Sequence, residues 1–205
     1  MNVVRILDDG GDGASFLETD GQVLPNGDIN AFHNLASVNV RSDDIIVSAY
    51  PKAGSHWVTE IIHFLLAGSV DVDDFQKMVT MIDSSPETAY RDLPSPRILN
   101  THLRLEQLPA DVLKKKNPVR EAVKLRDFLG VARSDEFVRQ VCEHCHFDSM
   151  QKRKATTEMG KYAFRKGKVG DWKNWFTVAQ KEWFDQLYKE KMADIPIKFR
   201  YTLDD

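Results

Sequence analysis

The chain has 205 residues, 42% of them hydrophobic, which is enough to bury the core of one domain. Its 28 Lys and Arg residues against 31 Asp and Glu residues give a formal net charge of −3, which excludes general attraction to nucleic acid or to an anionic membrane. Two cysteines, Cys142 and Cys145, are too few for a disulfide framework and indicate a reducing compartment.

The first 30 residues are rich in glycine and aspartate, and we predict a flexible N-terminal lead-in over 1–30 with one possible short strand. Residues 31–205 are predicted to form a single domain. The opening residues lack the basic start and apolar core of a secretory signal, and no apolar run elsewhere is long enough to span a bilayer. We therefore expect a cytoplasmic protein with no membrane partner.

The stretch DDIIVSAYPKAGSHWVTEIIHFLLAG, residues 43–68, predicts a buried strand, a turn and a helix. Pro51 and Gly54 break both the strand and the helix pattern, so the turn exposes backbone N–H groups where the helix begins. These groups, with Lys52 beside them, suit a phosphate or sulfate. The plainer alternative is an ordinary strand–turn–helix unit with a solvated lysine. The turn lacks the spaced glycines and Lys-Ser/Thr ending of a P-loop, which disfavours a nucleotide kinase.

Further elements follow in chain order. We predict a helix over 75–81 and a short strand over 97–99, whose end presents Thr101 and His102. Two strands with polar chemistry at their carboxyl ends are typical of an open parallel α/β sheet. A helix over 119–129 stops at Gly130, a second begins after a Ser134 cap, and a basic loop leads into a last helix over 177–192.

The run CEHCHF, residues 142–147, offers several zinc ligands. On a helix, Cys142 and Cys145 share a face while His144 points elsewhere, and no second cluster completes a tetrahedral set. We therefore predict no metal.

Taken together, four ordered segments resemble the cytosolic sulfotransferases, which transfer a sulfuryl group from 3′-phosphoadenosine 5′-phosphosulfate (PAPS). The segments are YPKAGSHW, PRILNTHLRLEQLP, HFDSM and FRKGKVGDWKNWFTVAQKEWFDQLYKEKM, and they resemble the family's YPKSGTxW, PRxxKTHLPxxxLP, SFxxM and RKGxxGDWKNxFT patterns. The resemblance implies a P-loop-like three-layer α/β sandwich with a central parallel sheet. It also implies a small-molecule acceptor: a phenol, an alcohol or an amine.

The resemblance implies roles for individual residues. Lys52 would contact the oxygen that bridges sulfate and nucleotide, and His102 would be the general base. Trp57 and Phe147 would flank the adenine, although both also suit ordinary core packing. The residues implied in binding PAPS are Lys52, Ala53, Gly54, Ser55, His56, Trp57, Phe147, Arg165, Lys166 and Gly167, the last three at the 3′-phosphate. Without the family pattern, His102 would be read as structural and the basic pair as a solvated loop.

The sequence also departs from the family pattern. Asn100 stands where the family has a second catalytic lysine, and an amide cannot neutralise a developing charge. Arg104 replaces a proline, and Ala53 and His56 replace hydroxyl residues of the phosphate loop. These replacements predict weakened catalysis.

An internal segment of the family is missing. The run LPADVLKKKNP, residues 108–118, joins two elements directly where the family has strands that bear part of the 3′-phosphate site and a Tyr-Glu-Asp motif. The parallel sheet is thus expected to be reduced, with unpaired strand edges.

We therefore predict a PAPS-dependent sulfotransferase-type protein with impaired activity. The alternative is a non-catalytic nucleotide-binding or dimer-partner protein. In this second case the stretch from Lys173 to Glu182, which fits the family's KxxxTVxxxE dimer contact, would form a homodimer. Its plainer interpretation is a capped helix start.

Overall fold

The computed structural model describes residues 2–7, 11–19, 22–25, 27, 29–103, 122–157, 160, 163–168 and 170–193. The chain divides into two compact units, Met1–Met150 and Gln151–Asp205, which are described separately below. Arg104 and the shortened junction 108–118, both singled out in the sequence, lie outside the described residues.

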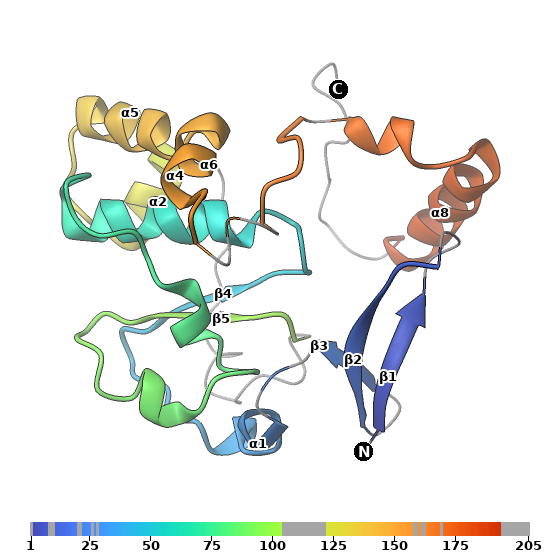
Figure 1. Ribbon diagram of the computed structural model, residues 1–205. Coiled ribbons are helices and arrows are strands. Elements are labelled where there is room, and N and C mark those ends of the chain that lie inside the picture. The colour runs from blue at the N-terminus through green and yellow to red at the C-terminus, as the bar shows by residue number, and fades with distance from the viewer. Residues whose placement is uncertain are drawn as a thin grey trace. The chain divides into compact units, whose positions relative to one another are not determined.

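The N-terminal residues form a three-stranded antiparallel sheet in the order β1-β2-β3 (Figure 1). Its strands are β1 Asn2–Leu7, β2 Gly13–Thr19 and β3 Gln22–Pro25. The prediction of one possible short strand is therefore wrong. The glycines and aspartates that dominate the composition fall mainly between these strands in the sequence, so composition alone hides the alternating residues that pair.

A parallel strand pair lies at the centre of the first unit. It consists of β4 Ile45–Ser48 and β5 Ile98–Thr101, with first residue opposite first and last opposite last. The pair confirms the predicted α/β class and both predicted strands. Among the described residues, no strand pairs with the other edge of β4. The full three-layer sandwich stays a prediction.

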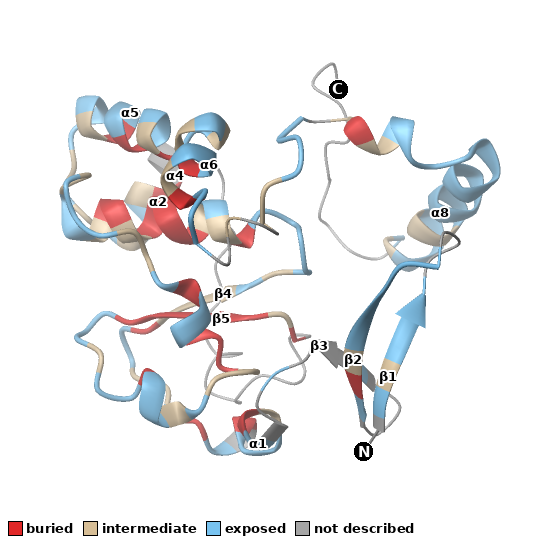
Figure 2. Cartoon of the chain, viewed as in Figure 1, coloured by how far each residue is buried: buried red, intermediate tan, exposed pale blue. Residues whose placement is uncertain are grey.

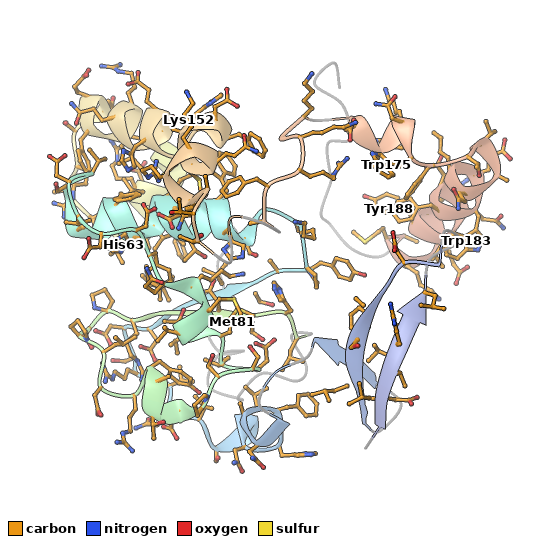
Figure 3. All side chains as sticks on the ribbon, viewed as in Figure 1. His63, Met81, Lys152, Trp175, Trp183 and Tyr188 are labelled. Atoms are coloured by element: carbon orange, nitrogen blue, oxygen red, sulfur yellow. The ribbon has the colours of Figure 1, made fainter. Side chains whose placement is uncertain are left out.

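The other edge of β5 is only partly covered. Met81 forms a single parallel bridge with Asn100 and lies beside β5 (Figure 3). The Ile82 amide donates to the Asn100 carbonyl at 2.9 Å. The predicted helix over 75–81 is wrong, because only the 3₁₀ turn η2, Lys77–Thr80, forms before the chain extends to reach β5.

Helix α2, Ser55–Ala67, follows β4 as predicted and contacts both strands. It also packs against α4 Ala122–Leu129 and α5 Asp135–His144. Its inner face is buried (Figure 2) and carries Ile61, Ile62, Phe64 and Leu65. The helix ends at Gly68, whose φ of 72° is a left-handed cap that glycine adopts readily.

A second apolar cluster lies around β5. It contains Leu17, Leu35, Val38, Ile82, Tyr90, Leu99 and Leu103. Short elements surround it: α1 Ile29–His33, η1 Leu35–Ser37 and η3 Glu87–Ala89. Residue Leu17 comes from β2, so the N-terminal sheet contributes to this core.

The helix predicted after Ser134 is split in two. The Ser134 hydroxyl accepts the Phe137 amide at 3.1 Å, which confirms the predicted cap of α5. After the break at Cys145, the chain restarts as α6 Phe147–Lys154. The family segment HFDSM thus lies at a helix start rather than along one continuous helix.

The second unit holds η5 Asp171–Asn174 and the predicted last helix, α8 Val178–Lys191. Thr177 and Gln180 form a capping box at its start. Every residue of α8 is at least partly exposed (Figure 2). No described helix is both long and apolar enough to cross a membrane.

Candidate functional site

The turn between β4 and α2 has a strained backbone. Lys52 has a φ of 65°, in the left-handed region that side chains with a Cβ rarely adopt, and Gly54 follows with a φ of 89°. The Ala53 amide donates to the Tyr50 carbonyl at 3.1 Å, which closes the turn. A non-glycine residue held in this region costs about 1–3 kcal/mol and often marks a functional position.

The start of α2 has no side-chain cap. Gly54 occupies the N-cap position and has no side-chain oxygen that could accept the first N–H groups of the helix. The turn itself is exposed, and Ser55 behind it is buried. A helix start of this kind, with its positive dipole end, suits the phosphate or sulfate predicted from the sequence.

His102 follows β5 directly and is fixed at two points. Its backbone N–H donates to Asp83 Oδ2 at 2.8 Å, and its Nδ1 lies 2.7 Å from the Ala49 carbonyl oxygen. A carbonyl can only accept, so Nδ1 carries the hydrogen and the neutral ring keeps Nε2 as the acceptor. The structure therefore holds His102 in the tautomer that a general base acting through Nε2 requires.

The structure places the Lys52 turn and His102 at the same edge of the parallel pair. The Ala49 amide donates to the Thr101 carbonyl at 3.2 Å, so the strand ladder continues up to the turn. This edge is where parallel α/β sheets build their sites. A cleft shared by the Lys52 and His102 side chains stays a prediction.

Asn100 belongs to a buried polar network beneath the turn. The Thr59 hydroxyl lies 2.8 Å from Asn100 Oδ1 and 2.7 Å from the Ser55 carbonyl oxygen. Asn100 Nδ2 donates to Thr80 Oγ1 at 3.0 Å, and Thr80 donates to the Lys77 carbonyl at 3.1 Å. Lys77 Nζ closes the network by donating to Ser55 Oγ at 2.8 Å. Asn100 is thus a structural amide that brings no charge to the site.

Sequence reasoning missed Lys77. The residue is only 5% exposed, although it lies in the segment 75–81 that the sequence predicts as a helix. Burial lowers the pKa of the Lys77 ammonium to about 8, partly offset by the Asp83 carboxylate. No local sequence signal marks it, because its contact with Ser55 joins residues 22 positions apart.

The two predicted aromatic residues differ in exposure. Trp57 lies in the first turn of α2 and is 52% exposed, so it is not a core residue as its plainer interpretation would have it. Phe147 is the first residue of α6 and is half-buried. Their pairing around a common adenine stays a prediction.

The predicted 3′-phosphate loop is organised around one carboxylate. Arg165 Nη1 and Lys166 Nζ both donate to Asp171, the lysine at 3.2 Å. The Arg165 guanidinium lies over the Trp175 ring, 5.2 Å from its centroid, a cation–π arrangement. Gly167 continues the loop with a φ of 59°. Arg165 and Lys166 are therefore held by contacts with Asp171 and Trp175, and are not simply solvated.

Asp171 stays ionised under all ordinary conditions. Hydrogen bonds from Asn174 and then Arg165 hold the pKa of the Asp171 carboxyl well below its usual range. The charge that orders the basic loop is accordingly insensitive to mild acid.

Zinc ligands do not gather in the part of the chain that the structure describes. Cys142 is exposed and Cys145 is buried, and no three His, Cys, Asp or Glu side chains among the described residues could hold a metal ion.

The sequence of this chain matches known proteins along most of its length. A family described as "Sulfotransferase domain" matches residues 42–117 and 113–196. Sulfotransferase 1E1 of Bos taurus is 26% identical over 269 residues, covering 84% of this chain and 91% of the relative. Cytosolic sulfotransferase 1 of Danio rerio is 24% identical over 284 residues, covering 91% and 95%.

Solved structures share the fold. The mouse sulfotransferase SULT7A1 complexed with PAP superposes with a TM-score of 0.69 at 20% identity, covering 88% of this chain and 96% of that one. A retinol dehydratase in complex with androsterone and the inactive cofactor PAP gives a TM-score of 0.67 at 12% identity, covering 92% of each chain.

These alignments also show that this chain is shorter than its relatives. The alignment with the Bos taurus protein covers 269 residues, more than the 205 of this chain. The two matched ranges of the family overlap at 113–117, inside the junction that the sequence predicts to have lost a segment. The chain belongs to the sulfotransferase domain family, as an internally shortened member.

Proposed function

We propose that this chain binds PAPS and its desulfated product PAP at the turn of residues 51–54 and the first turn of α2. We further propose that it transfers the sulfuryl group to a phenol, an alcohol or an amine, more slowly than its longer relatives. The observation that carries this proposal is the placing of an uncapped helix start and a His102 with an acceptor Nε2 at one edge of the β4–β5 pair. Two solved relatives contain PAP, and one also contains androsterone.

The chain's own residues divide the work of the transfer. His102 Nε2 takes the proton of the acceptor hydroxyl or amine as the acceptor atom forms its bond to sulfur. The bond between sulfur and the bridging oxygen breaks, and its electron pair leaves on the 5′-phosphate of PAP. Lys52 and the α2 amides then stabilise the charge on that phosphate. PAPS itself supplies the sulfuryl group.

The rate is expected to be low. Asn100 is fully buried and its amide is bonded to Thr59 and Thr80, so it offers no charge to the leaving group. Losing one preorganised donor at a charge-developing site costs roughly two to three orders of magnitude in rate. Transfer of radiolabelled sulfate from PAPS to simple phenols and steroid alcohols measures this. Turnover at micromolar PAPS equal to that of a full-length relative would contradict the expected loss.

The same buried amide favours a second candidate, a non-catalytic nucleotide-binding or dimer-partner protein. The stretch from Lys173 to Glu182 carries large exposed apolar side chains, Trp175, Phe176 and Val178, and Figure 3 marks Trp175 in this region. PAP binding without any transfer would favour this second function over the first. Sedimentation of the chain at several concentrations would then measure dimer formation.

Replacing Trp57 by alanine is expected to weaken PAP binding by about 1–3 kcal/mol, the usual value of stacking between a base and an aromatic side chain. The half-exposed indole offers a face for the adenine. Isothermal titration calorimetry measures the change, with Trp183→Ala on α8 as a matched control at another exposed tryptophan. Unchanged affinity in Trp57→Ala would place the adenine elsewhere.

Replacing Lys52 by glycine is expected to weaken PAP binding without lowering the stability of the fold. Glycine adopts the φ of 65° freely, so the free energy of unfolding should stay equal or rise by up to about 1 kcal/mol. PAP affinity should fall in Lys52→Gly and Lys52→Ala alike, because both lose the ammonium. Urea unfolding and calorimetry test the pair. A loss of stability in Lys52→Gly would show that the lysine is held there for structural reasons.

A further inference from the structure

Lys77 places a buried positive charge directly behind the proposed anion site. The ammonium is 5% exposed, and its Nζ lies 2.8 Å from the hydroxyl of Ser55, the first residue of α2. It comes from η2, outside both strands and α2. Burying an ammonium is costly, so a fold that keeps one here is expected to gain something from it.

The contact with Lys77 determines the donor and acceptor roles of the Ser55 hydroxyl. An ammonium only donates, so Ser55 Oγ accepts from Lys77 and keeps its own hydrogen for another acceptor. An oxygen that accepts from a cation also becomes a stronger donor, because hydrogen bonds in a chain polarise one another. Ser55 follows the strained turn at the uncapped start of α2, where the proposed phosphate would accept that hydrogen.

The same network links Lys77 to the uncharged Asn100. Thr59 contacts both the Ser55 carbonyl and Asn100, and Asn100 reaches Lys77 through Thr80. The amide thus helps to hold η2 and α2 in the positions that let the ammonium meet the hydroxyl. The positive charge next to Ser55 thus comes from Lys77 on η2, whereas Asn100 on β5 is uncharged.

We propose that Lys77 is a positioning residue that orients and polarises the Ser55 hydroxyl toward the 5′-phosphate of a bound 3′-phosphonucleotide. The proposal rests on the proposed function, because it assumes that PAP binds at the α2 start.

A double-mutant cycle on PAP binding tests it in the full chain. Lys77→Met is expected to weaken PAP binding about tenfold, the scale of one charge-assisted hydrogen bond. In a Ser55→Ala background, the same Lys77→Met change should cost less than about twofold, because the two groups act as one unit. Lys189→Met, at an exposed lysine of α8, is the matched control and should leave affinity unchanged. Urea unfolding shows whether each variant is folded.

Proton uptake gives a second readout, measured on the unaltered chain and then on Lys77→Met. Burial lowers the pKa of Lys77 to about 8, and the nearby Asp83 carboxylate partly offsets this effect. A bound phosphate should favour the protonated amine, so PAP binding at pH 8 should take up a fraction of a proton. The phosphates of PAP, with a second pKa of about 6, are already ionised there. Calorimetry in two buffers of different ionisation enthalpy measures the uptake, and Lys77→Met should abolish it.

The outcomes separate the two proposals. Equal cost of Lys77→Met with and without Ser55, or proton uptake that persists in the variant, would overturn the role of Lys77 while PAP binding stands. Failure of the unaltered chain to bind PAP would overturn the proposed function and the role of Lys77 together. We expect nonadditive losses of PAP affinity in the Lys77 and Ser55 variants, and no proton uptake in Lys77→Met.

Discussion

Replacing Asp44 by alanine is expected to lower the free energy of unfolding by about 3–5 kcal/mol, because it leaves the Arg97 guanidinium buried without the carboxylate that neutralises it. The two side chains are 0% and 2% exposed, and Arg97 donates to Asp44 at 2.8 Å through Nε and 2.5 Å through Nη2. The hydrogen bond to Asp44 raises the pKa of Arg97, but a guanidinium is not deprotonated in proteins even without such a partner. The arginine therefore remains charged when Asp44 is lost. Urea unfolding followed by circular dichroism measures the loss.

The neighbouring Asp43→Ala is the matched control, because Asp43 is exposed; it should change stability by less than about 0.5 kcal/mol. Asp44 immediately precedes β4 and Arg97 immediately precedes β5. The pair therefore fixes the amino ends of both strands and, through their register, the edge that carries His102. Similar effects of Asp43→Ala and Asp44→Ala would mean that this pair does not anchor the strands.

Restoring a lysine at Asn100 is expected to destabilise the fold without restoring transfer. The new ammonium would replace an amide that is fully buried and bonded to Thr59 and Thr80. It would also share the network with the Lys77 ammonium. A buried charge without a partner costs about 3–5 kcal/mol, and repulsion from the Lys77 ammonium would add to this cost. Urea unfolding and the sulfate-transfer assay together measure the outcome.

The double variant Asn100→Lys/Lys77→Met tests whether the loss of stability comes from having two ammonium groups. It keeps one ammonium in the network and should recover part of the stability lost in Asn100→Lys. Full stability and a large gain in transfer by Asn100→Lys alone would show that the site accepts two cations, and that the uncharged Asn100 is what limits the rate.

The sequence predicts the parts of the site whose structure is determined by local residue patterns. The β-branched run at 45–47, the break at Gly54 and the spacing of Ile61, Ile62 and Leu65 place the strand, the turn and the helix correctly, because each depends on residues close in sequence. His102 follows the same logic: it comes directly after a short apolar strand, and the structure puts it at the strand's carboxyl end.

The features that the sequence does not predict depend on contacts between residues far apart in the chain. The segment 75–81 has helical spacing, yet Met81 pairs with β5, so the tertiary bridge overrides the local preference. Lys77 is buried through a contact with Ser55 that no local pattern shows. The carboxylate that orders Arg165 and Lys166 lies in the recognised GDW motif, but its function as their partner depends on the fold of the loop.

Backbone amide chemical shifts of the isotope-labelled chain, followed during a PAP titration, map directly where PAP binds. We predict the largest shifts at the start of α2, in Gly54, Ser55 and Trp57, together with His102 at the end of β5. These are the amides closest to the proposed phosphate and acceptor sites. Shifts confined to other parts of the chain, or none at millimolar PAP, would contradict a sulfotransferase-type nucleotide site in this protein.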